Sequence, residues 1–312
     1  MAGAERAMTT AAEGLLSALP PGGEQHACHP FTGPARTQWS YLPGPRRGIA
    51  LSELGTAGRK AAHRLLATAL SRATFAQAVT IMAFEEVLDL DEHGQRGRHS
   101  SGYHAAVFGS PGDDTWAWRF EGHHLSVTVT IIAGQPVVAP LFMGANPAQV
   151  RHNGQLVIAP LLREEELARA LITGLPPALR DLAVIAGTAP PDIITTTATA
   201  AGSPLQPTGI TLSRLPEQAR GQVRQLLGIY LDRLAPDLAD GEHRAADSEV
   251  TFAWAGGLLA DDAHYYRIQE PGLLIEYGNS QRHADHAHTV LRRPGQDFGA
   301  ALLASHLAAE RP

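Results

Sequence analysis

The stretch that decides the fold runs Trp116-Ala-Trp-Arg-Phe-Glu121 and then His123-His-Leu-Ser-Val-Thr-Val-Thr-Ile-Ile-Ala133. Apolar and polar side chains alternate along both segments, which is the pattern of β-strands with two different faces. Similar short segments at 103–108 and 137–142 flank them, with Gly, Pro and Asp at the junctions. The block therefore predicts an antiparallel meander.

Outside this block, apolar residues recur with the spacing of helices or of a second group of strands. Helices are predicted over 52–88 (a hairpin with Ser71 as a cap), over 161–185 (two helices divided by Pro176-Pro177), over 215–234 and over 297–306. Strands are predicted at 250–254, 264–269, 273–277 and 286–291, and the Thr- and Ile-rich residues 192–201 are compatible with another. Because the blocks are segregated rather than alternating, we expect an α+β fold, with antiparallel sheet or sheets and segregated helices around a central His-lined site.

Domain organisation is predicted to be simple. The chain has 312 residues, of which 44% are hydrophobic and 18% are charged, as in a folded protein. Residues 1–30 are rich in Ala, Gly and Pro and weakly patterned, which predicts a loosely ordered N-terminal arm or a short helix rather than core. Residues 31–312 are predicted to form a single α+β domain.

Composition excludes several classes of function. The net charge is −6 and no Lys/Arg cluster of five to eight residues occurs, so we expect no nucleic-acid partner. Cys28 is the only cysteine, which rules out an internal disulfide and a zinc site built on several thiolates. No run approaches the ~18 consecutive apolar residues of a membrane span, so no membrane partner is expected. The first residues lack the pattern of a signal peptide, and we expect a cytoplasmic protein; a homo-oligomer is left open.

Histidine carries the main functional signal. The chain has 15 histidines, and His286-Ala-His288 falls in a predicted strand. Two residues apart on a strand, both imidazoles project from one face with Cα atoms roughly 6.5 Å apart, so both can reach one metal ion. The third ligand would come from His123, His124, Glu276 or His264.

The pair His123-His124 presents alternatives. If both lie on a strand, they face opposite sides unless Gly122 introduces a bulge, so one of them is expected to face the site. His123 shares a face with apolar residues, which suggests burial, with Glu121 as its hydrogen-bond partner. Glu276 stands in an apolar strand, where a carboxylate without a partner would be costly. A metal ion or an arginine would compensate it, and either Glu121 or Glu276 could serve as a fourth ligand or general base.

Candidate substrate-binding residues are Arg36, Arg47 and Arg267, which could bind a carboxylate or phosphate, and Trp118, on which a substrate could stack. Ordinary salt bridges and a packed sheet face explain the same four residues without a substrate. Both interpretations stay open.

Seven motifs resemble the domain-of-unknown-function 3500 family of bacterial proteins. They are Trp39-Ser-Tyr-Leu-Pro-Gly-Pro-Arg-Arg-Gly48, Trp116-Ala-Trp-Arg-Phe-Glu-Gly-His-His-Leu-Ser126, Pro140-Leu-Phe-Met-Gly-Ala-Asn-Pro147, His264-Tyr-Tyr-Arg-Ile-Gln269, Leu274-Ile-Glu-Tyr-Gly-Asn-Ser-Gln281, Asp285-His-Ala-His-Thr289 and Asp297-Phe-Gly299. The resemblance covers nearly the whole chain and implies one continuous domain, with His123, His124, Glu276, His286 and His288 as a joint site. It implies no reaction. The chain departs from the family pattern at Gly278, where an acidic residue is usual.

These observations lead to three hypotheses. The first is a metal-dependent enzyme acting on a small polar, anionic molecule, with His286, His288 and one of His123 or His124 as ligands of zinc, iron or copper, and with oxidative or hydrolytic/lyase chemistry. The second is a metal-free protein that binds a small ligand through a histidine network. The third is acid–base catalysis by a His/Glu pair such as His123 with Glu121.

Overall fold

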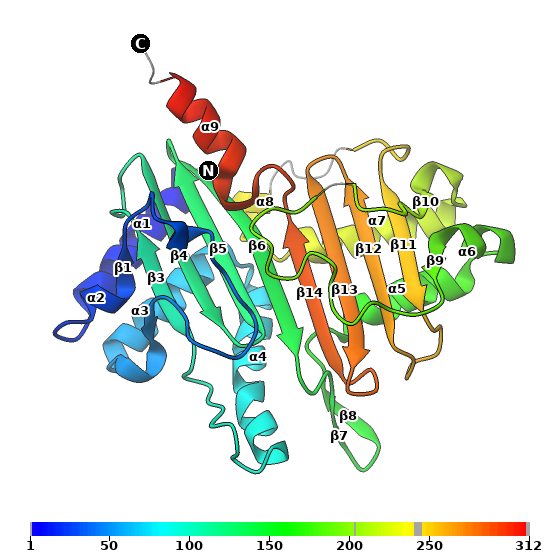
Figure 1. Ribbon diagram of the computed structural model, residues 1–312, viewed down its shortest axis with the longest axis horizontal. Helices are drawn as coiled ribbons and strands as arrows, with labels where there is room; N and C mark the ends of the chain where they lie inside the picture. The colour runs from blue at the N-terminus through cyan, green and yellow to red at the C-terminus, as the bar shows by residue number, and fades with distance from the viewer. Residues whose placement is uncertain (1, 203, 240–244, 310–312) are drawn as a thin grey trace. The chain divides into compact units, whose positions relative to one another are not determined.

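The computed structural model describes residues 2–202, 204–239 and 245–309 (Figure 1). Its strands are mostly antiparallel, and its helices occupy blocks of sequence separate from the main strand blocks. The predicted α+β class is therefore confirmed. Contacts divide the chain into two compact units: unit 1 comprises residues 1–142, 233–240 and 295–312, and unit 2 comprises residues 143–232 and 241–294. The two units are described separately.

Unit 1 combines a strand meander with a helical hairpin. Its strands are β1 (Cys28–His29), β2 (Ile49–Ala50), β3 (His104–Phe108), β4 (Thr115–Gly122), β5 (Leu125–Ile132) and β6 (Gln135–Ala145, of which 135–142 belong to this unit). Its helices are α1 (Ala2–Ser17), α2 (Glu24–Ala27), α3 (Thr56–Ala69), α4 (Arg72–Asp91), α8 (Pro236–Ala239) and α9 (Ala300–Ala309). Ser71 caps α4, because its Oγ accepts a hydrogen bond from the backbone N–H of Thr74.

The two faces of this sheet differ in chemistry. Trp118 and Phe120 are fully buried, and the ring of Phe120 lies 6.1 Å from that of His63 on α3. Arg119, on the opposite face, donates to two backbone carbonyls of residues 35 and 36, in the loop that crosses this face (Figure 1). The sheet therefore has an apolar helix face and a polar face covered by a loop.

Unit 2 also combines antiparallel strands with helices. Its strands are β7 (Val150–His152), β8 (Gln155–Ile158), β9 (Val184–Ala186), β10 (Ile210–Thr211), β11 (Thr251–Gly256), β12 (His264–Glu270), β13 (Leu273–Gln281) and β14 (His286–Arg292). Its helices are α5 (Leu162–Gly174), α6 (Pro177–Ala183) and α7 (Glu217–Leu231). The order in the sheet is β14-β13-β12-β11-β10, with β9 beside β11, and β7 and β8 form a separate hairpin.

Helices and a long loop cover opposite faces of the unit 2 sheet. On the helix face, the hydroxyl groups of Tyr266 and of Tyr230 on α7 lie 2.7 Å apart, and Tyr277 donates to Glu165 on α5. On the other face, Glu276 and Arg267 bind backbone groups of the segment between β9 and β10, of which the structure describes residues 187–202 and 204–209. We call this segment the covering loop.

Two segments differ from the sequence-based expectation. Residues 2–17 form helix α1, whose Met8, Ala12 and Leu15 side chains are fully buried, so this part of the N-terminal segment is ordered and packed. The single-domain boundary at about residue 30 stays a prediction. Residues 192–201 form no strand but part of the covering loop. The strand prediction is wrong there, because backbone N–H groups of this segment bind a buried carboxylate instead of a neighbouring strand.

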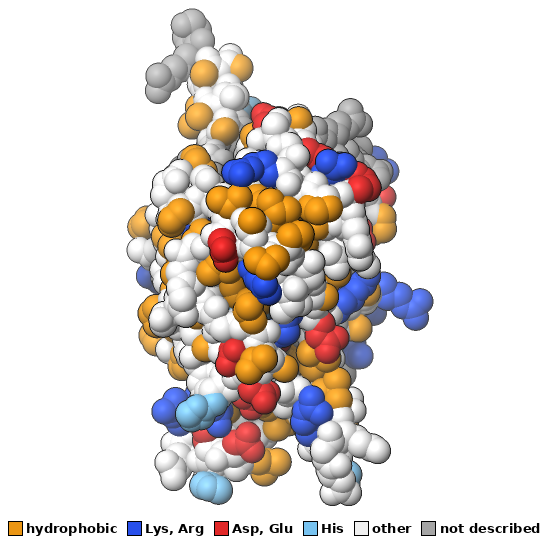
Figure 2. Space-filling view, turned by 90° about the vertical axis from the view of Figure 1, so that its right-hand side faces the viewer, with side chains coloured by type: hydrophobic (Ala, Val, Ile, Leu, Met, Phe, Trp, Pro, Cys, Tyr) orange, Lys and Arg blue, Asp and Glu red, His pale blue; other side chains and the backbone are white. Residues whose placement is uncertain are grey.

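Two surface properties bear on partners. In the part of the chain that the structure describes, no helix has both the length and the apolar character needed to cross a bilayer. Figure 2 shows one face of the molecule, on which apolar side chains gather between charged ones. Such a gathering is typical of an interaction surface, and a homo-oligomer stays a prediction.

Candidate metal centre

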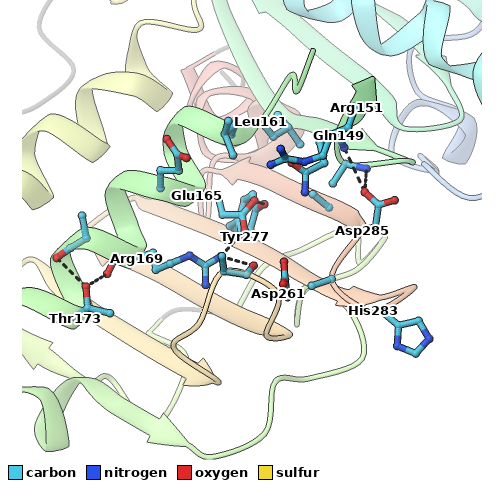
Figure 3. A pocket seen from close by; sticks show the side chains of 17 residues that line it. Gln149, Arg151, Leu161, Glu165, Arg169, Thr173, Asp261, Tyr277, His283 and Asp285 are labelled. Atoms are coloured by element: carbon cyan, nitrogen blue, oxygen red, sulfur yellow. Dashed lines mark hydrogen bonds and ion pairs between the residues drawn. The ribbon is translucent and has the colours of Figure 1, made fainter. Parts of the chain in front are cut away.

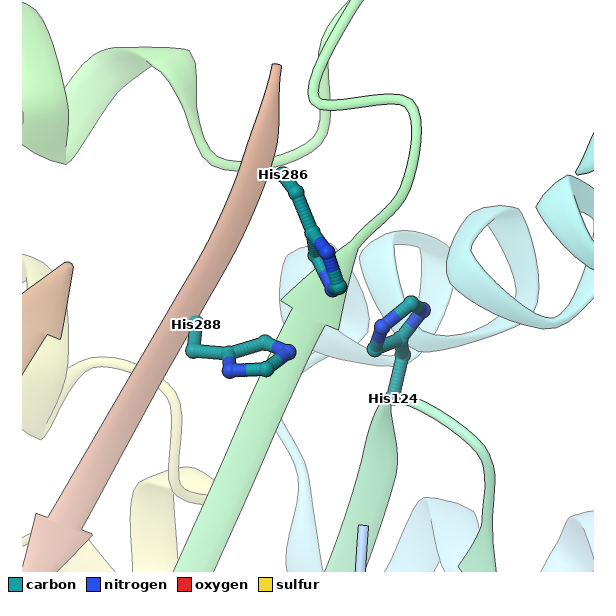
Figure 4. Close-up of side chains that lie close together, drawn as sticks. All are labelled: His124, His286 and His288. Atoms are coloured by element: carbon teal, nitrogen blue, oxygen red, sulfur yellow. The ribbon is translucent and has the colours of Figure 1, made fainter. Parts of the chain in front are cut away.

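The pair His286 and His288 projects from strand β14 as the sequence pattern predicts. The two rings lie 4.5 Å apart between centroids and are nearly perpendicular (Figure 4). His288 is buried, and His286 is half-buried. Opposite His288, in register, stands Gly278 on β13, which has no side chain to fill the space beside the imidazole.

A carboxylate fixes the orientation of His288. Oδ1 of Asp192, in the covering loop, lies 2.7 Å from Nδ1 of His288. Because an ionised carboxylate only accepts hydrogen bonds, Nδ1 is the donor in this contact, and in the neutral form of the ring the lone pair is on Nε2. A carboxylate behind a histidine is typical of metal-ligating imidazoles, where it sets the tautomer and raises the basicity of the ligand nitrogen.

Glu276 holds the loop that carries Asp192. Its buried carboxylate accepts hydrogen bonds from the backbone N–H of Ile194 (2.7 Å), from the N–H (3.1 Å) and hydroxyl of Thr195, and from the hydroxyl of Tyr265 (2.7 Å). Burial, together with the charge of Glu276, raises the pKa of Tyr265 well above its usual value, so this hydroxyl stays a donor. These donors compensate the burial of the Glu276 carboxylate, a role for which the sequence suggested a metal ion or an arginine.

The histidines His123 and His124 form the turn between two strands. Gly122 pairs with Leu125, so the two histidines make up a two-residue hairpin loop, and His124 has a φ of 63°. Predicting their faces from strand alternation is therefore wrong. Gly122 is required here, because a Cβ atom would overlap the ring of Tyr103, whose hydroxyl donates to the carbonyl of His123 at 2.6 Å.

The carboxylate partner of His123 is Glu85, on helix α4. Oε1 of Glu85 lies 2.6 Å from Nδ1 of His123 and 4.0 Å from Nδ1 of His124, and the two imidazole rings lie 3.6 Å apart. Burial lowers the pKa of His123, and Glu85 opposes that shift. The predicted partner, Glu121, instead accepts from the backbone N–H of Ser40 at 2.9 Å. That part of the prediction is wrong.

The described residues thus include groups of buried His and Glu side chains that could hold a metal ion. In one group, ligand atoms of Glu85, His123 and His124 all lie within 4.8 Å of one another. The guanidinium of Arg98 lies 3.0 Å from Nδ1 of His123, however, and 4.0 Å from Glu85. A fixed positive charge at this distance disfavours a second cation.

The predicted substrate-binding residues lie in varied surroundings. Arg36 donates to the carbonyls of Phe298 (2.7 Å) and Phe31 (3.2 Å), and Arg267 donates to the carbonyls of Leu205 (3.2 Å) and Pro207. These bonds hold loops. Arg47 is exposed, and Trp118 is fully buried on the helix face of its sheet. A substrate role for these four residues stays a prediction.

Sequence reasoning missed two carboxylates. Glu85 stands inside the apolar pattern of α4, and Asp192 follows Pro190-Pro191 in a stretch that was compatible with a strand. The sequence signal that could have found them is a charged residue within an apolar pattern, which is the signal that Glu276 also gives. Neither residue is near its histidine in the sequence, because 38 residues separate Glu85 from His123 and 96 separate Asp192 from His288.

Fold and site together define an α+β protein whose sheets carry a loop-covered polar face with buried histidines and carboxylates. The chain belongs to the family described as "Protein of unknown function (DUF3500)", whose model matches residues 2–300. The predicted family is therefore confirmed. Searches of curated proteins and of solved structures found no match to the chain.

Proposed function

We propose that the protein is a metal-dependent enzyme in which His286 and His288 bind one divalent ion of zinc, iron or copper (Figure 4). The observation that carries this proposal is the 2.7 Å contact between Asp192 and Nδ1 of His288. It leaves Nε2 as the ligand atom of a histidine that has a second histidine beside it on the same strand. The third ligand, expected from the sequence to be one of His123 or His124, stays a prediction.

The donor set determines the chemistry that the ion would supply. Neutral imidazole ligands leave the two positive charges of the ion uncompensated, so a metal ion held this way would acidify a bound water and attract anions. This supports a small polar, anionic substrate without requiring any of the candidate arginines. Hydrolytic or lyase chemistry would follow with zinc, and oxidative chemistry with iron or copper.

Metal content tests the proposal. We expect full-length protein purified without a tag to contain about one ion per chain by plasma mass spectrometry, and His288→Ala to lose it. The matched control is His152→Ala, at an exposed position of β7, which should keep the metal. Circular dichroism would verify that both variants are folded. Protein that is purified empty and takes up no added zinc, iron or copper, or a His288→Ala variant with unchanged content, would overturn the assignment.

A second candidate function rests on the 2.6 Å contact between Glu85 and His123. A neutral imidazole paired with a carboxylate is an acid–base dyad, and the lowered pKa of His123 keeps the ring neutral near pH 7. Such an enzyme would be indifferent to chelators and would lose activity in Glu85→Gln. Chelator sensitivity therefore separates the two candidates.

A further inference from the structure

The first part of the covering loop, residues 187–202, crosses the sheet of unit 2 without secondary structure of its own. The structure describes all of these residues, and none of them belongs to a helix or a strand. They run from the end of β9, which lies beside β11, to side chains of β14 (Figure 1). Connections of this length are uncommon in compact domains and often act as lids. We call residues 187–202 the crossing segment.

The crossing segment takes little part in the apolar core. Among its described residues, three side chains are buried: those of Ile193, Thr195 and Ala201. The opposite face of the same sheet is packed differently, because helix α5 lies over Tyr277 (Figure 3) and its Ala168, Leu171 and Ile172 side chains are at most 1% exposed. Apolar burial is the main force that holds an element in place. Packing therefore holds the crossing segment more weakly than it holds α5.

Hydrogen bonds between backbone groups and side chains of the sheet hold the crossing segment instead. The carboxylate of Glu276 accepts from the N–H groups of Ile194 and Thr195 at 2.7 and 3.1 Å. On the next strand, Nη2 of Arg292 donates to the carbonyl of Ala198 at 2.8 Å. Water can replace the partner in each of these bonds, so they favour a closed position without making it permanent.

The crossing segment covers charged groups rather than an apolar surface. The side chains of Glu276 and Arg292 are both fully buried. Burial of charged groups costs hydration, which offsets part of what their bonds contribute to closure. Lifting the segment would expose these charges and their backbone partners to water together, so none of them would stay buried without a partner. Opening therefore costs less free energy than the number of bonds suggests.

Glycine stands at each end of the crossing segment. A Cβ atom added at Gly187 or Gly202 would meet no heavy atom of the described residues within 4 Å, apart from the chain neighbours, so both positions have room to rotate. Glycine also adopts a wider range of backbone conformations than any other residue, which suits a hinge. Beyond Gly202, the side chain of Gln269 binds the N–H of Leu205 at 2.6 Å and its carbonyl at 3.2 Å. The chain is thus anchored again after the second glycine.

We propose that residues 187–202 form a lid that opens about hinges at Gly187 and Gly202. In the closed position the lid holds Asp192 2.7 Å from Nδ1 of His288. In the open position His288 loses this carboxylate, and the polar face with Glu276 and Arg292 becomes accessible to a small polar ligand. The lid thus couples access to this face with the orientation of His288. The inference goes beyond the proposed function and does not rest on it, since the hydrogen bonds that hold the lid involve no metal ion.

Hydrogen exchange of the full chain, measured by mass spectrometry at single-residue resolution, tests the opening. We expect the amides of Ile194 and Thr195 to exchange at least about 100-fold faster than those of β12 and β13, because a local opening leaves the sheet folded. Both should exchange more slowly than an unprotected peptide, since the closed lid shields them. Exchange as slow as that of the strands would overturn the lid, and exchange at the unprotected rate would overturn its closed position.

Two matched variants attribute the opening to the bonds with Glu276. Thr195→Val removes a hydroxyl that donates to this carboxylate and keeps the size of the side chain. We expect the amide of Ile194 to exchange about tenfold faster in this variant, because a hydrogen bond to a charged group is lost. Thr199→Val makes the same change at an exposed position of the lid and should exchange like the wild type. The proposal is overturned if Thr195→Val leaves the exchange of Ile194 unchanged, or if it accelerates the amides of β12 and β13 equally.

Discussion

The substitution Asp192→Asn tests the arrangement around His288 without removing a proposed metal ligand. Asparagine keeps the size of the side chain and an Oδ1 atom that can still accept from Nδ1 of His288 and from the backbone N–H of Ile193, both now at 2.7 Å. Only the negative charge is lost. The variant therefore isolates the electrostatic contribution of the carboxylate to the metal affinity of the histidine.

The size of the effect follows from the contact. The pair is short, and the side chains of His288 and Asp192 are only 5% and 20% exposed, so solvent screens the interaction weakly. Loss of such a carboxylate typically lowers metal affinity 10- to 100-fold, which corresponds to about 1.4–2.7 kcal/mol. We expect Asp192→Asn to bind zinc more weakly by that factor.

A competition titration against a chromophoric zinc chelator measures this change. The matched control is Asp181→Asn, which removes a carboxylate from an exposed position of α6 and should leave the affinity unchanged. An Asp192→Asn variant that binds zinc within about twofold of the wild type would refute the reasoning. In that case the carboxylate would orient His288 for a purpose other than metal binding.

Two further predictions concern stability. His264 is fully buried, and burial lowers its pKa to about 3, whereas an unfolded histidine titrates near 6.5. As the pH falls, the unfolded chain takes up the proton of this histidine before the folded chain does. The contribution of the buried neutral His264 to the free energy of unfolding is therefore complete above about pH 6.5 and is lost toward pH 3. When the pH is lowered from 7.5 to 5.0, we expect the free energy of unfolding, measured with urea, to fall by about 2 kcal/mol more in the wild type than in His264→Phe. Parallel pH profiles of the two proteins would contradict this. Leu15→Ala, in α1, should lower the free energy of unfolding by about 2–4 kcal/mol. The control Leu90→Ala, in α4 at a site that is 77% exposed, should lower it by less than about 0.5 kcal/mol. Equal effects would show that α1 lies outside the folded core.

Alternation and helical spacing predicted most of the strands and long helices correctly, because burial of one face imposes that period on the sequence. The same rule failed at His123-His124. A hairpin loop of two residues continues the alternation of its strands, and neither residue is the Gly or Asn that usually marks such a turn. His124 adopts a φ of 63° nonetheless. The backbone there is fixed from outside by Tyr103, which lies 20 residues away from His123 in the sequence.

Contacts between distant segments decided the rest of the candidate site. His286 and His288 are two residues apart on one strand, so their spacing alone predicts that both side chains project from the same face. The carboxylate behind His288 is 96 residues away, and no periodic pattern connects the two. A single sequence shows which residue types are present on each element, but the loop that brings a carboxylate to a histidine is set by tertiary packing.

Three features that look unrelated in the sequence have one physical cause in unit 2. Glu276 is a carboxylate in an apolar strand, residues 192–201 have strand-like composition without forming a strand, and Asp192 faces His288. Burial of Glu276 would be costly without donors, and the backbone of Ile194 and Thr195 supplies two of them. Once those N–H groups bind the carboxylate, they are unavailable to a strand ladder, so the segment stays a loop. Asp192 stands two residues before the first anchored N–H, which holds its carboxylate against the imidazole. Glu276 thus positions Asp192 against His288 through this loop, and its role as a ligand or general base stays a prediction.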